Sequence, residues 1–101
     1  MVKFYASDVT RITGVKKSRL QAWLERGFVA PSVHVADGTG DRNIFGVSDI
    51  FKIASLKSLI DYGIKRETAA ELISELDFKN TSIDNENSYT IQINLKLNVS
   101  E

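Results

Sequence analysis

The segment GVKKSRLQAWLERGF, residues 14–28, concentrates cationic side chains at the start of a short predicted helix. Lys16, Lys17 and Arg19 stand at the end of this helix where the helix dipole is positive. Cations at that end oppose the dipole, so they are better placed to meet an external anion than to stabilise the helix. The chemistry that they offer is therefore the binding of phosphate or a similar anion.

The helix that carries these cations has one predicted buried side. At about 100° per residue, Leu20, Trp23 and Leu24 cluster on that side. Burial of each contributes about 1.5 to 3 kcal/mol and decides which side docks against the core. The remaining residues are then expected to point outward, with Gln21 on the flank. They are Ser18, Arg19, Ala22 and Arg26.

A second predicted helix precedes the cationic one. It covers residues 7–13, with Ser7 as the expected N-cap and Gly14 as its end. The cationic helix follows at residues 17–26 and is closed by Gly27. Two short helices joined by a glycine-containing turn predict a helix-turn-helix.

The stretch after the helix-turn-helix is rich in β-formers and turn residues. Residues 28–45 place valines before ADGTGD and an apolar pair after it, which predicts a β-hairpin with a mobile polar tip. Arg42 and Asn43 stand at the base of this hairpin. The spacing of apolar residues predicts two further helices, over residues 47–62 and 66–76.

The end of the chain changes character twice. Residues 77–88 are polar and without a period, which predicts a linker, and residues 89–99 alternate without a fault, which predicts an amphipathic β-strand. Such a strand must pair, either within the chain or with the same strand of a second copy. We favour the second copy because a two-fold strand pair supplies a dimer. The predicted dimerisation residues are Tyr89, Ile91, Ile93, Leu95, Leu97 and Val99.

Composition limits the classes of function. The chain of 101 residues has the size of one domain, and its lack of cysteine excludes disulfides, thiolate metal sites and thiol catalysis. The sequence shows no signal peptide and no membrane span, so we expect a cytoplasmic protein. Residues 1–35 carry six cationic and two acidic side chains, whereas residues 67–101 carry two cationic and seven acidic side chains. This polarity favours a domain that presents one face to phosphates, with ordinary uneven solvated charge as the alternative.

No group of side chains points to catalysis. The sole histidine, His34, lies in the predicted hairpin without an evident carboxylate pair beside it. Asp37, Asp41 and Asp49 do not follow the spacing of a calcium loop. We therefore expect no enzymatic activity, no metal and no cofactor.

The order and spacing of these features resemble the MerR family of winged-helix transcription regulators over residues 4–76. The marks of the resemblance are Gly14-Val15, the spacing Leu20…Trp23…Gly27, Pro31, Arg42 ahead of Phe45, Asp49-Ile50 and Tyr62-Gly63-Ile64. The resemblance implies a mainly α fold with a small β component: a winged helix-turn-helix of four helices and a hairpin wing. The C-terminal amphipathic strand is an addition to it.

The resemblance also implies partners. A homodimer would place the second helix of each helix-turn-helix in a major groove of double-stranded DNA, with two wings on the backbone. Family activators distort promoters so that RNA polymerase can engage, which makes polymerase a further implied partner. The implied DNA-binding residues are Lys16, Lys17, Ser18, Arg19, Gln21, Ala22, Arg42, Lys65 and Arg66, to which we add Asn43 beside Arg42.

The sequence departs from the family pattern at two places. Gln21-Ala22 stands where the family usually has Arg-Tyr, although Gln can pair with adenine and Ala can touch a thymine methyl. The pattern of the residues after 76 does not predict the long dimerisation helix of the family, and we expect no effector domain. Two alternatives stay open: an excisionase-like DNA-binding accessory protein, and a winged-helix module that binds an acidic protein instead of DNA.

Overall fold

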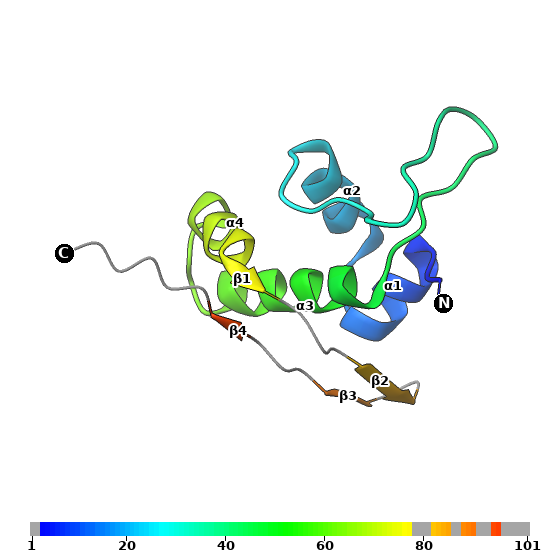
Figure 1. The fold of residues 1–101 in the computed structure, drawn as a ribbon. Coiled ribbons are helices and arrows are strands. Elements are labelled where there is room, and N and C mark those ends of the chain that lie inside the picture. The colour runs from blue at the N-terminus through cyan, green and yellow to red at the C-terminus, as the bar shows by residue number, and fades with distance from the viewer. Residues whose placement is uncertain (1–2, 78–81, 86–87, 91–93, 96–101) are drawn as a thin grey trace.

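The part of the chain that the structure describes contains four α-helices and four short strands, joined by loops (Figure 1). This structure is a computed structural model that describes residues 3–77, 82–85, 88–90 and 94–95. The helices are α1 (Ala6–Thr13), α2 (Lys17–Glu25), α3 (Val47–Asp61) and α4 (Arg66–Ser74). The strands are β1 (Leu76–Asp77), β2 (Ser82–Asn85), β3 (Ser88–Thr90) and β4 (Asn94–Leu95). The four predicted helices are confirmed, and α3 packs against both α1 and α4 while α2 packs against α1.

Helix α1 is bounded by an acidic residue and a glycine. The prediction that Ser7 caps it is wrong, because α1 begins one residue earlier. Instead, the backbone N–H of Tyr5 donates to Oδ2 of Asp8 at 2.9 Å, which satisfies one of the unpaired donors at the helix start. Gly14 ends α1 with φ of 76°, a conformation that favours glycine, and donates its N–H to the Thr10 carbonyl at 2.9 Å.

The start of α3 is held by a buried carboxylate. Oδ2 of Asp49 accepts hydrogen bonds from the Gly46 N–H at 2.8 Å, the Ser32 N–H at 2.8 Å and the Ser32 hydroxyl at 2.7 Å. Asp49 is only 4% exposed, and these donors allow a charged group to stay buried. The bonds also fix the chain after α2 to the first turn of α3.

Substitution of Asp49 tests this anchor. We expect Asp49→Ala to lower the free energy of unfolding by about 2 to 3 kcal/mol, because it leaves Ser32 and Gly46 donors without their acceptor. Urea denaturation followed by circular dichroism measures the change. Asp37→Ala is the matched control, since it removes the same charge from an exposed residue of the loop between α2 and α3. Equal losses in the two variants would contradict the assigned role.

The core gathers residues from all four helices. The buried residues are Val9, Val15, Leu20, Trp23, Val29, Phe45, Ile50, Phe51, Ile53, Leu56, Ala69 and Ile73. On α2, Leu20 and Trp23 are each 1% exposed and Leu24 is half-buried, so the predicted buried side is confirmed. Among the described residues, no helix combines the length and the apolar character that a bilayer crossing requires.

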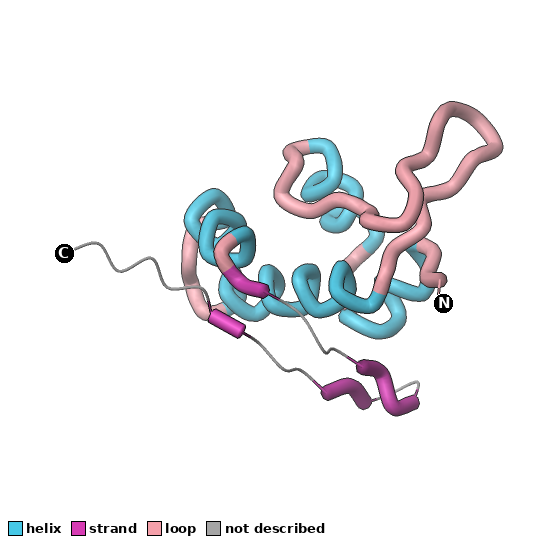
Figure 2. Tube along the Cα trace, in the orientation of Figure 1, coloured by secondary structure: helices cyan, strands magenta, loops and turns pink. Residues whose placement is uncertain are grey.

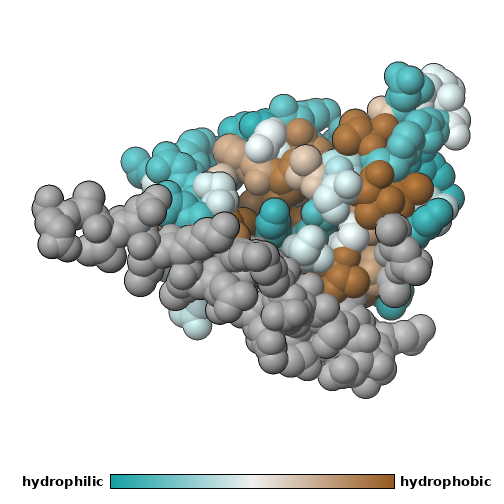
Figure 3. Space-filling model, viewed as in Figure 1, coloured by the Kyte–Doolittle hydropathy of each residue, from teal (hydrophilic) through white to brown (hydrophobic). Residues whose placement is uncertain are grey.

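The hairpin predicted over residues 28–45 is not confirmed. Between α2 and α3 the chain is a loop (Figure 2), closed by a single antiparallel bridge between His34 and Ile44. The returning chain pairs elsewhere, because Phe45 bridges to Phe4 near the start of the chain, with N–H···O distances of 2.7 and 3.1 Å. We call residues 34–44 the wing loop, and hydrophilic residues cover its tip (Figure 3).

The strands that follow α4 pair within the chain. Both pairs are antiparallel: β1 with β4, and β2 with β3. Strand β2 lies inside the predicted linker, residues 77–88. The turn-forming residues of this segment indicated a linker, but such residues are also typical of hairpins. The prediction of a strand over residues 89–99 that pairs across a dimer is not confirmed. Tyr89 lies in β3 and Leu95 in β4; Ile91, Ile93, Leu97 and Val99 lie outside the described residues.

Candidate nucleic-acid interface

A cleft of about 340 Å³ opens between the starts of α1 and α2 and the wing loop. Its lining residues are Ala6, Ser7, Thr10, Lys17, Arg42 and Asn43. Three of the predicted DNA-binding residues, Lys17, Arg42 and Asn43, thus meet in one place. Ser7 and Thr10 were not predicted, although two hydroxyl residues three positions apart on a helix share a face, which is a signal that the sequence carries.

The cleft has the chemistry of an anion site. It combines a lysine, an arginine, the Ser7 hydroxyl and an amide, and none of its lining residues is acidic. The Thr10 hydroxyl donates to the Ser7 carbonyl at 3.0 Å. An anion with several acceptor oxygens, such as a phosphate, suits donors arranged in this way.

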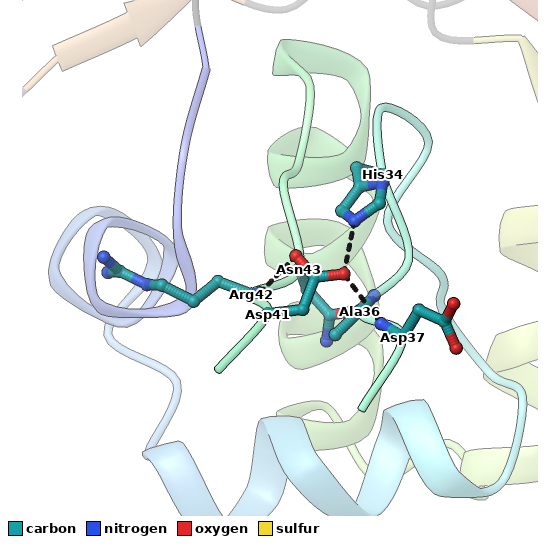
Figure 4. A network of polar contacts seen from close by, with 6 residues as sticks. All are labelled: His34, Ala36, Asp37, Asp41, Arg42 and Asn43. Carbon is teal, nitrogen blue, oxygen red and sulfur yellow. Dashed lines mark hydrogen bonds and ion pairs between the residues drawn. The ribbon is translucent and has the colours of Figure 1, made fainter. Parts of the chain in front are cut away.

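Arg42 is aimed at the cleft by an aromatic ring. Its guanidinium carbon lies 3.9 Å from the centroid of the Tyr5 ring, within the range of a cation–π interaction. In Figure 4 the Arg42 side chain points away from the rest of the wing loop, toward α1. Tyr5 was not predicted, because nothing in the sequence shows that two residues so far apart in the chain stack on each other.

The backbone that carries Arg42 is organised by one carboxylate, Asp41 (Figure 4). Oδ2 of Asp41 lies 2.7 Å from His34 Nε2 and accepts the Asp37 N–H at 2.8 Å. Oδ1 accepts the Arg42 N–H at 2.9 Å. No pattern in the sequence indicated a carboxylate beside His34, and the structure places one there. Its role is to shape the loop.

The amide of Asn43 closes the same loop from the other side. Its Oδ1 accepts the Ala36 N–H at 2.7 Å, and the residue is half-buried. Side chains therefore provide much of the loop closure that a β-ladder would provide in a hairpin. Asn43 was predicted as a DNA contact, and in the structure its side chain also stabilises the wing loop.

The ionisation of Asp41 predicts how the wing loop responds to acid. The pKa of Asp41 is lowered from its usual 3.8, mainly by the hydrogen bond from His34 and then by the N–H groups of Asp37 and Arg42. A lowered pKa means that the charged form stabilises the loop above pH 3.8 and that this contribution is lost as the pH falls through the lower, folded-state value. We expect the amide resonance of Arg42, whose N–H donates to Oδ1 of Asp41, to shift below about pH 4 in NMR spectra. In Asp41→Asn this transition should be absent, and an unchanged transition in that variant would contradict the assignment.

The outward face of α2 matches the prediction in part. Lys16, Lys17, Ser18, Gln21 and Arg26 are exposed, and Ala22 is half-buried. Lys16 immediately precedes the helix and Lys17 is its first residue. Gln21 Nε2 donates to Glu25 Oε2 at 3.2 Å, one turn further along the exposed face.

Arg19 does not face outward as predicted. It is half-buried, its guanidinium carbon lies 5.2 Å from the centroid of the Trp23 ring, and its Nη2 lies 3.7 Å from Oδ1 of Asp61 in α3. The attraction of the indole face and of the carboxylate explains the difference. The side chain of Arg19 therefore reaches the end of α3, and Arg19 does not line the cleft.

The predicted second wing lies at the start of α4. Lys65 immediately precedes this helix and Arg66 is its first residue, and both are exposed. Neither lines the cleft. Among the described residues, no group of three or more His, Asp or Glu side chains is placed to hold a metal ion.

Two short helices joined by a glycine turn define a helix-turn-helix, and a cleft lined by Lys17 and Arg42 opens at the start of the second helix. Residues 4–76 match the family model described as the MerR HTH family regulatory protein, and the chain belongs to this family. The regulators of this family bind double-stranded DNA.

Similar proteins carry names of the same class. An uncharacterized HTH-type transcriptional regulator of Mycobacterium bovis is 28% identical over 64 residues, and so are two of Mycobacterium tuberculosis. The matched segment is 63% of this chain and 28% of each relative. The chain thus spans less than a third of the length of these relatives.

Proposed function

We propose that this chain is a sequence-specific regulator that binds double-stranded DNA as a homodimer in the cytoplasm. The exposed face of α2 enters the major groove, while the wing loop and the start of α4 contact the backbone. The observation that supports this proposal is the cleft in which Lys17 and Arg42 converge with the hydroxyl groups of Ser7 and Thr10. RNA polymerase at the promoter is a further partner under this proposal.

The cleft acts as a clamp on one backbone phosphate. Lys17 supplies a point charge, and the guanidinium of Arg42, held over Tyr5, supplies several N–H donors in a fixed plane. A phosphate held at the start of α2 sets the register of this helix on the duplex, since backbone contacts position a protein without reading sequence.

Base reading falls to the exposed residues of α2. Gln21 pairs bidentately with adenine, and Ala22 touches a thymine methyl group. To do so, Gln21 breaks its 3.2 Å hydrogen bond to Glu25 and forms hydrogen bonds to the edge of the base. Lys16 and Ser18 lie on either side of Lys17 and add contacts at the groove edge, and Lys65 and Arg66 grip the backbone from the start of α4.

Homodimer formation is supported by the strands that follow α4. Within the described residues each sheet has only two strands, so each keeps outer edges with which a second copy can pair. A two-fold dimer would present two copies of α2 to two half-sites. Analytical ultracentrifugation tests this: a homodimer has twice the 11.3 kDa mass of one chain, and a species of 11.3 kDa at micromolar concentration would contradict it.

The DNA-binding proposal is tested by fluorescence anisotropy with a random-sequence duplex. If a dimer engages about six to ten phosphates, affinity falls by roughly a thousandfold or more between about 50 and 200 mM salt. Selection of bound sites from a random pool then gives the preferred sequence and the half-site spacing. Absence of binding at low salt would contradict the proposal and favour a module that binds an acidic protein.

A further inference from the structure

An acidic residue at the end of α3 lies beside one cation of α2. Asp61, the last residue of α3, lies between Lys57 and Arg19. Its Oδ2 accepts a hydrogen bond from Lys57 Nζ at 3.0 Å, and its Oδ1 lies 3.7 Å from Arg19 Nη2. The two cations thus meet different oxygens of one carboxylate, and Lys57 is the closer of the two.

This unequal sharing makes Arg19 the partner that can leave. The side chains of Arg19 and Asp61 are 35% and 48% exposed, so water and salt screen their attraction. If Arg19 departs, Lys57 still compensates the carboxylate from the same helix at one-turn spacing. The pKa of Asp61 is lowered, mainly by the hydrogen bond from Lys57, and the group is ionised at neutral pH.

We propose that Asp61 acts as an internal substitute for a DNA phosphate: it holds Arg19 in the free protein and weakens binding to the DNA backbone by competing for that cation. This inference rests on the proposed DNA-binding function. The Trp23 ring, 5.2 Å from the guanidinium carbon, gives Arg19 its position in the free state. In the complex, Arg19 leaves Asp61 and binds a phosphate at the edge of the groove.

We expect Asp61→Asn to strengthen DNA binding, whereas most substitutions near an interface weaken it. Removal of an exposed ion pair frees Arg19, so affinity for a random duplex at low salt rises about two- to fivefold per chain. The salt dependence steepens, with the slope of log affinity against log salt more negative by up to about 0.9 per chain. Fluorescence anisotropy at several salt concentrations measures both quantities.

A matched control separates local competition from general charge. Glu71→Gln removes the same charge from the exposed side of α4, where the described residues show no hydrogen bond or ion pair to its carboxylate. It should raise affinity much less than Asp61→Asn. In an Arg19→Gln background, Asp61→Asn should change affinity no more than Glu71→Gln does, because the contested cation is gone.

The outcomes distinguish this inference from the function on which it depends. Equal effects of Asp61→Asn and Glu71→Gln, or an effect of Asp61→Asn that persists without Arg19, would leave only general electrostatics and overturn the inference. Weaker binding by Asp61→Asn would also overturn it, since Asp61 would then position Arg19 for DNA. In both cases the proposed function stands. If the unaltered chain binds no duplex, the proposed function fails and the inference fails with it.

Discussion

Replacement of Trp23 with alanine lowers the free energy of unfolding by about 3 to 5 kcal/mol, the usual loss when a buried aromatic residue is truncated in a core. Trp23 is 1% exposed and belongs to a helix of nine residues, too short to be stable without packing. The main-chain carbonyl of Trp23 also accepts the Phe28 N–H at 3.0 Å, where the chain leaves the helix. Loss of the side chain therefore loosens α2 and its connection to the next segment.

Urea denaturation followed by circular dichroism in the far ultraviolet measures this loss. Trp23→Phe keeps an aromatic ring in the same site and should cost less than half as much. Leu24→Ala, at a half-buried neighbour on the same side of the helix, should also cost less. If Trp23→Ala costs under about 1 kcal/mol, Trp23 does not anchor the recognition helix.

Removal of the two cleft cations has the largest expected effect on DNA binding. We expect Lys17→Ala and Arg42→Ala each to weaken binding about tenfold, because each removes a charge-assisted hydrogen bond to phosphate. The double variant should bind roughly 30- to 100-fold more weakly, with less than full additivity because the two side chains line one cleft. The slope of log affinity against log salt becomes shallower by about 0.9 for each phosphate that the variant no longer neutralises.

Lys52→Ala is the control for net charge. Lys52 lies on α3 and lines a different cavity, together with Ala70 and Ile73 of α4. Its replacement should change affinity by less than about twofold. If Lys52→Ala and Arg42→Ala weaken binding equally, total charge and not the cleft governs affinity.

The fold of the helical part was largely predictable because its signals are local. Apolar residues at helical spacing and the glycines at positions 14, 27 and 63 set the ends of the helices within two residues. The wing loop was not predictable in the same way. Val29, Val33 and Val35, before and within it, favour a strand. Yet Phe45 pairs with Phe4, a contact between distant parts of the chain that no short pattern encodes.

The residues of the candidate site also separate into those that the sequence could predict and those that it could not. Lys17 and Arg42 could be found from residue type and from the family resemblance, and the structure brings them together. Tyr5 and Asp61 could not, because their roles arise from packing between elements. Helical geometry placed Arg19 on the outward side of α2, but Trp23 and Asp61 turn its side chain toward α3. A helical projection cannot include the neighbours of a flexible side chain.

Closure of the wing loop by the side chains of Asp41 and Asn43, with one backbone bridge at its base, makes its tip permissive to evolutionary change. In a hairpin built on a ladder, an inserted residue slips the register and exchanges the two faces of the strand. Here the tip residue Thr39 can change in a lineage while the flanking bonds keep their partners, whereas the positions of Gly38 and Gly40 favour glycine because their φ angles are 96° and 88°. Diversification of the wing can therefore proceed at its tip without moving the arginine at its base.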